Sequence, residues 1–73
     1  MHDNRLESAK RFVKEHLNKQ RCLTVKSKRT GEEFIIAQQY PAYDGWFVYQ
    51  GCDLIIGDIP FDYAVRVLLD VTE

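Results

Sequence analysis

Residues 44–60, DGWFVYQGCDLIIGDIP, decide the fold of this chain. Two apolar segments, 46–50 and 53–57, flank the pair Gly51-Cys52, and this pattern is typical of a β-hairpin. Upstream, Asp44-Gly45 turns the chain into the first of these strands. Downstream, Asp58 stands where the N-cap of a helix would be, with Pro60 in the first helical turn. We therefore predict a hairpin followed directly by a helix over residues 60–70.

Two further strands are predicted before the hairpin. Residues 22–29 alternate, with Leu23 and Val25 on one face and lysines on the other, as expected of an edge strand. Residues 33–40 contain four apolar residues in succession, which is typical of a strand buried on both faces. Pro41 lacks a backbone donor and ends this strand.

Residues 3–20 precede all four strands and have apolar residues at spacings of three and four, which predicts an amphipathic helix capped by Asp3 or Asn4. The predicted order is α-β-β-β-β-α with short loops. Such loops require an antiparallel meander sheet with a helix before it and a helix after it. We expect one small α+β domain over residues 1–73.

Both faces of the predicted sheet are apolar. Even-numbered and odd-numbered residues of a strand point to opposite faces, and apolar residues occur at both. One parity holds Phe34, Ile36, Trp46, Val48, Leu54 and Ile56, and the other holds Ile35, Ala37, Phe47, Tyr49 and Ile55. Two arrangements fit this pattern. Either each helix covers one face, or both helices share a face and the other face is left to a partner protein or a second copy of the chain.

Charge is divided unevenly along the 73 residues. Residues 1–30 have nine Lys or Arg against three acids, a charge of +6, and residues 31–73 have one Arg against eight acids, a charge of −7. No apolar run reaches the roughly 18 residues of a membrane span, so we expect a cytoplasmic protein that does not contact a membrane. In that compartment Cys22 and Cys52 are expected to be free thiols.

The sequence offers no catalytic or metal-binding pattern. His2 and His16 are the only histidines, and neither has a Cys or carboxylate at the spacing of a metal site. Nucleophilic catalysis needs a hydroxyl or thiol beside a histidine and a third orienting group, and nothing in the sequence places these together. We therefore expect a protein that is not an enzyme and has no cofactor.

Protein binding is the function we expect, because aromatic side chains gather around the loop at 41–45. Buried aromatics often provide most of the binding energy of an interface. The candidate protein-binding residues are Tyr40, Tyr43, Asp44, Trp46, Tyr49 and Asp53. Asp44, Asp53, Asp58 and Asp62 fall in turns or in a first helical turn and would present an acidic patch to a basic partner. For Trp46 the alternative is a core position.

Nucleic-acid binding is the alternative function, through basic residues of the first helix and first strand. The residues are Lys10, Lys14, Arg21, Lys26 and Lys28, with Arg29 beside them. The helix-strands-helix order is similar to that of double-stranded-RNA-binding domains. Those domains have a lysine-rich start to the last helix, whereas this chain has Asp58 and Asp62 there.

The C-terminal half carries a second resemblance. It has the apolar strand 46–49, a turn at Gly51, a short strand 54–56, and Gly57 and Pro60 before the final helix. In this order of features the chain resembles the YrhB-like family of small bacterial immunity proteins. The resemblance covers about a third of the chain and implies that it binds and blocks a cognate protein toxin. As concrete forms of the protein-binding function we expect either such toxin neutralisation or a phage-type inhibitor.

Overall fold

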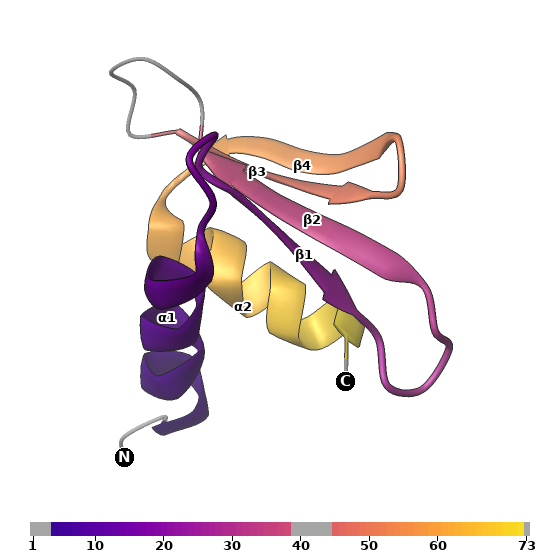
Figure 1. Cartoon of the computed structure of the whole chain (residues 1–73), viewed down its shortest axis with the longest axis horizontal. Helices are drawn as coiled ribbons and strands as arrows, with labels where there is room; N and C mark the ends of the chain where they lie inside the picture. The colour runs from indigo at the N-terminus through magenta and orange to yellow at the C-terminus, as the bar shows by residue number, and fades with distance from the viewer. Residues whose placement is uncertain (1–3, 39–44, 73) are drawn as a thin grey trace.

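The computed structural model describes residues 4–38 and 45–72 and confirms the predicted α+β fold. The elements are α1 (Asn4–His16), β1 (Cys22–Lys26), β2 (Glu33–Gln38), β3 (Trp46–Gln50), β4 (Asp53–Ile59) and α2 (Phe61–Thr72). The strands form one antiparallel sheet in the order β1-β2-β3-β4, as predicted for a meander. Figure 1 shows both helices on the same side of this sheet. No helix in the described residues is long and apolar enough to cross a membrane.

The helix α1 is shorter than predicted, since it ends at His16 and not at residue 20. Asn18 ends it: its Oδ1 accepts hydrogen bonds from the backbone N–H groups of Gln20 (2.8 Å) and Cys22 (3.0 Å). Such a side-chain-to-backbone turn competes with helical hydrogen bonding. Arg21 then adopts a left-handed φ of 62° as the chain reverses into β1.

The strand β1 also ends early, at Lys26 and not at residue 29. The hydroxyl of Ser27 accepts hydrogen bonds from the N–H groups of Arg29 (3.3 Å) and Thr30 (3.4 Å). Gly31, with φ of 78°, donates its N–H to the carbonyl of Ser27 at 2.9 Å. Ser27 thus closes a turn that the alternating sequence pattern does not reveal.

The core lies between the sheet and the helices. Ile36 of β2, Val48 of β3 and Val65 of α2 are fully buried, and Val13 of α1 is 1% exposed. Figure 1 shows α2 lying under the sheet, with α1 packed beside it. Both helices therefore cover one face, which is the second of the two arrangements that the sequence allowed.

The strand β4 departs from the predicted alternation. Its pairing with β3 shifts twice, since Trp46 pairs with Ile59, Val48 with Ile56 and Tyr49 with Leu54. Each shift places an extra residue in β4, and an extra residue of this kind changes which side of the sheet the following side chains occupy. Leu54 precedes both shifts. The two-residue turn pairs Gln50 with Asp53 and Tyr49 with Leu54, so Leu54 faces the side of Tyr49 and not the side of Val48 as its parity predicts. The first shift then returns Ile56 to the side of Val48.

The second shift lies opposite Phe47, where β4 has Gly57 and Asp58. A side chain at Gly57 would come within 2.5 Å of the Phe47 ring, so the ring occupies the space above the glycine. Asp58 has a left-handed φ of 56°. The predicted N-cap role of Asp58 is wrong, because β4 runs on through Ile59 and the carbonyl of Pro60 accepts the first helical hydrogen bond, from Ala64 (3.0 Å).

Candidate functional site

The candidate site is the sheet face that points away from the helices, here called the outer face. It consists of five apolar side chains, none of which packs against the core: Ile35, Ala37, Phe47, Tyr49 and Leu54. Ile55 follows Leu54 as the unpaired extra residue of β4. Leu54 is 55% exposed and Ile55 is 41% exposed. No helix in the described part of the chain lies over this face (Figure 1).

Each side chain of the outer face is positioned by strand pairing. Ile35 is directly opposite Tyr49, and Tyr49 is opposite Leu54, so the three form a row across β2, β3 and β4. A second row begins with Ala37 and Phe47. The rings of Phe47 and Tyr49 are stacked with their centroids 6.4 Å apart, an arrangement typical of paired aromatics. The result is an apolar platform built on three paired strands.

The turn between β3 and β4 gives one end of the platform an acidic border. An open recess there is lined by Glu32, Glu33 and Asp53 together with residues 50–52. The side chain of Gln50 contacts the carboxylate of Glu32, and the N–H of Gly51 donates to the carbonyl of Glu33 at 3.0 Å. Of these acids, Glu33 is on the same side of β2 as Ile35, and Asp53, opposite Gln50, is on the other side of the sheet. Charge at the border of an interface acts mainly on the association rate.

The structure separates the predicted protein-binding residues. Tyr49 lies on the outer face, whereas Asp53 pairs with Gln50, which pairs with Phe34, and so Asp53 is on the side of the sheet opposite Tyr49. Trp46 is 6% exposed and packs against Phe61, with the ring centroids 4.5 Å apart and the rings tilted by 48°, so it is a core residue, as the alternative interpretation had it. Tyr40, Tyr43 and Asp44 lie outside the described residues.

The predicted acidic patch does not form as one surface. Asp53 and Asp58 lie at opposite ends of β4. Asp62 belongs to α2 on the helix side, where its carboxylate accepts a hydrogen bond from Nζ of Lys10 at 3.0 Å. This contact with Asp62 raises the pKa of Lys10, against a smaller opposing effect of desolvation.

The predicted nucleic-acid residues are likewise dispersed. Lys10 is paired with Asp62, and Nζ of Lys14 lies 5.2 Å from the ring centroid of Phe61. The Nε of Arg21 donates to the side chain of Gln38 at 2.8 Å.

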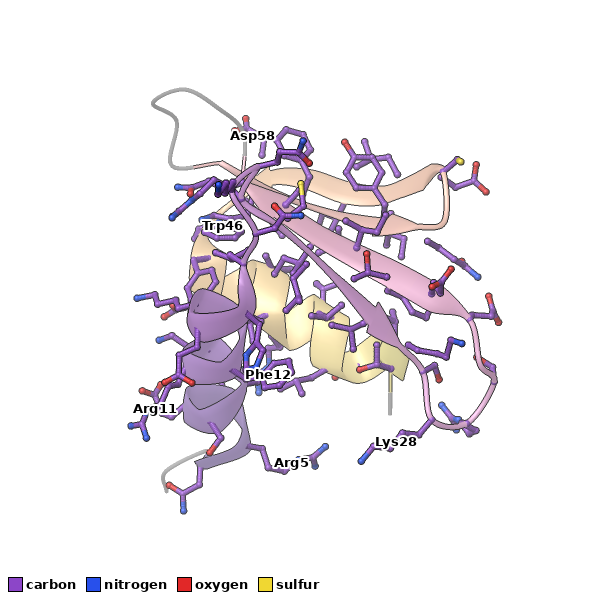
Figure 2. The ribbon with its side chains drawn as sticks, in the orientation of Figure 1. Arg5, Arg11, Phe12, Lys28, Trp46 and Asp58 are labelled. Carbon is purple, nitrogen blue, oxygen red and sulfur yellow. The ribbon has the colours of Figure 1, made fainter. Side chains whose placement is uncertain are left out.

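The remaining basic residues lie at the far end of β1. Lys26 is about 16 Å along the strand from Arg21. Lys28 lies in the turn beyond it (Figure 2). The structure therefore does not gather these side chains into one basic surface.

Comparison with known proteins gives no relative from which a function could be transferred. No family model, curated protein or solved structure matches the chain. Among residues 4–38 and 45–72, no group of three or more His, Cys, Asp or Glu side chains could hold a metal ion. Cys22 and Cys52 are free thiols. The outer face is thus the feature on which a functional proposal can rest.

Sequence reasoning missed one member of this surface. Leu54 was placed on the parity of Ile36 and Val48, although it pairs with Tyr49. The signal that could have found it is the Gly51-Cys52 turn, since a two-residue turn places position 49 opposite position 54. On the helix side, Phe12 of α1 is 49% exposed although its spacing places it on the apolar stripe.

Proposed function

We propose that this chain is a non-enzymatic protein-binding module whose interface is the outer face of the sheet. The supporting observation is the five-residue apolar platform that no described helix covers. Burying apolar surface contributes about 25 cal/mol per Å². The largest apolar patch on the surface of a monomer is often its interaction site.

The size of the platform indicates how a partner would dock. Three strands spaced about 4.8 Å apart, each contributing about five residues at 3.3 Å, give an area of roughly 240 Å². A stable interface buries about 800 Å² on each partner. The platform is therefore the apolar centre of the interface, and Glu33, on the same side of β2 as Ile35, belongs to its border.

An acidic border favours a partner that is basic around an apolar centre. Nucleic-acid-processing toxins are commonly basic because they hold phosphate groups. The resemblance to small immunity proteins points to the same class. Neutralisation of a basic bacterial toxin or enzyme is the concrete form of the proposal.

The experiment that tests the proposal compares two exposed positions on different surfaces. A photo-crosslinking amino acid replaces Leu54 on the outer face in one sample and Tyr63 on α2 in another; these residues are 55% and 54% exposed. After irradiation in a lysate of the source organism, position 54 should give a specific adduct and position 63 should not. The captured protein is then purified for binding measurements.

Affinity for that protein provides the quantitative test. Leu54→Lys should weaken binding by about thirtyfold or more, as expected for a central apolar contact, and Tyr63→Lys should leave it within about twofold. Equal crosslinking from both positions, or full affinity of Leu54→Lys, would contradict the proposal.

A further inference from the structure

The free edge of β1 can be analysed from its backbone hydrogen bonds. The N–H of Gln38 donates to the carbonyl of Arg21 at 3.0 Å, and the N–H of Ser27 donates to the carbonyl of Glu32 at 2.8 Å. Bonding alternates along an antiparallel ladder. Positions 21, 23, 25 and 27 therefore bond to β2, and the N–H and C=O groups of positions 22, 24 and 26 point away from the sheet.

Of these three outward positions, only Cys22 has its backbone groups hydrogen-bonded within the described residues. The N–H of Cys22 donates to Oδ1 of Asn18 at 3.0 Å, and the carbonyl of Cys22 accepts from the N–H of Asn18 at 3.0 Å. Within the described residues, no group takes the outward N–H and C=O of Thr24 or Lys26. Two residues of backbone are thus ready to pair with another strand.

An apolar groove lies directly beside this edge, on the helix side. It has a volume of about 350 Å³ and is bounded by Val25 of β1, by Ala9 and Phe12 of α1, and by Leu68 and Thr72 of α2. The hydroxyl of Thr72 is bonded to the carbonyl of Leu68 at 2.8 Å and is not offered to the groove. Figure 2 shows Phe12 on the side of α1 that faces α2 and β1. The groove exists because α1 packs on α2 and leaves β1 largely uncovered.

The edge and the groove together specify the shape of an occupant. A strand added to β1 would lie about 4.8 Å from it, and alternate side chains would point to the helix side next to Val25. Those side chains would enter the groove, while the peptide groups would bond to Thr24 and Lys26. A helix or a small apolar ligand would fill the groove but leave these backbone groups without partners.

Charge around the edge specifies the chemistry of the occupant. Residues 16–31 contain no acidic residue and five basic ones, of which Lys26, Lys28 and Arg29 lie at the end of β1 and in the turn after it. Lysine on an edge strand opposes indiscriminate strand pairing. An acidic strand would overcome that opposition by charge complementarity.

We propose that β1 binds an extended acidic segment of a partner protein as a fifth strand, with its apolar side chains in the groove. This surface is separate from the outer face, and the proposal does not depend on the function assigned to that face.

The test uses a displayed library of random twelve-residue peptides, selected on the full chain. The selected peptides should alternate apolar with polar residues and be rich in Asp and Glu. A selected peptide is then synthesised and its binding followed by NMR. The amide signals of Thr24 and Lys26 should shift downfield and exchange more slowly with solvent, because these amides become hydrogen-bonded. Signals of Tyr49 and Leu54 should stay in place.

Two pairs of variants separate this mode of binding from others. Thr24→Pro removes an outward N–H that β2 does not use, and should weaken binding by about tenfold, whereas Thr24→Ala keeps the N–H and should bind within about twofold. Phe12→Asp should weaken binding through the groove. Arg11→Asp adds an acid on the opposite side of α1, away from the groove (Figure 2), and serves as its matched control.

Three results would overturn the proposal. The library could yield no binding peptide, the peptide could bind Thr24→Pro and Phe12→Asp as tightly as wild type, or the shifted signals could map to the outer face. If Thr24→Pro does not fold, the Phe12 and Arg11 pair and the NMR shifts decide the outcome alone.

Discussion

The two faces of the sheet have similar sequences and different surroundings. Ile36 and Val48 on the inner face are fully buried, whereas their neighbours Ile35 and Tyr49 on the outer face are only partly buried. The difference arises from the helices, which both pack on the inner face. An apolar strand residue that points to the inner face therefore contributes to the core. One that points to the outer face is available for binding.

The largest expected effect concerns neighbouring isoleucines. Ile36→Ala should lower the free energy of unfolding by about 2–5 kcal/mol, because it removes buried methyl groups and leaves a cavity. Ile35→Ala should cost about 1 kcal/mol or less, since water already reaches that side chain. Urea unfolding followed by far-UV circular dichroism measures both values. Equal losses at the two positions would show that the outer face is covered in solution.

The next effect concerns the glycine beneath the outer face. Gly57→Ala should lower the free energy of unfolding by about 1–3 kcal/mol, because the added methyl would meet the Phe47 ring at 2.5 Å. Phe47→Leu should relieve the clash. The double variant should therefore lose less free energy of unfolding than the two single variants lose when their losses are added. If the two losses of unfolding free energy are strictly additive in a double-mutant cycle, the Phe47 ring does not lie over Gly57.

The outer face should also affect association in the absence of any partner. At high micromolar concentration the chain is expected to self-associate, because its exposed apolar platform favours burial. Leu54→Lys should make it monomeric with its stability changed by no more than about 0.5 kcal/mol. Sedimentation equilibrium measures the assembly. A wild-type chain that stays monomeric and binds no hydrophobic dye would argue against an exposed apolar outer face.

The smallest effect is electrostatic and belongs to the helix side. The contact with Asp62 raises the pKa of Lys10 above its ordinary value of 10.5. A raised pKa in the folded state means that the contact stabilises the fold below about pH 10.5, and that this stabilisation is lost as the pH rises through the higher value. NMR titration of Lys10 should show its pKa lowered in Asp62→Asn. An unchanged pKa would mean that the two side chains do not interact in solution.

The sequence predicts the fold correctly where hydrophobic period and turn residues agree. Both strands of the hairpin begin at the predicted residues, 46 and 53, because Gly51, with φ of 60°, supplies the turn between them. Element ends were less accurate. The polar side chains of Asn18 and Ser27 close local turns that compete with the helix and the strand, and periodicity carries no information about such hydrogen bonds.

The candidate site was predicted only in part, for a different physical reason. The two apolar parities show that the sheet has two apolar faces, but they do not show which face the helices cover. Tyr49 was placed on the parity opposite Ile36 and Val48, and it faces the side away from them. Leu54 was placed on the parity of Ile36 and Val48, but the two-residue turn pairs it with Tyr49 and so puts it on the outer face. Trp46 could be a core or a binding residue by sequence, and its contact with Phe61 places it in the core.

The most direct test of the central claim is NMR cross-saturation of the labelled chain in complex with the protein captured through Leu54. Protons of the partner transfer saturation only to residues at the interface. Signals of Ile35, Tyr49 and Leu54 should lose intensity, while those of Tyr63 and Arg66 on α2 should not. Loss confined to α2, with the outer face unaffected, would contradict the assignment of the outer face as the binding surface.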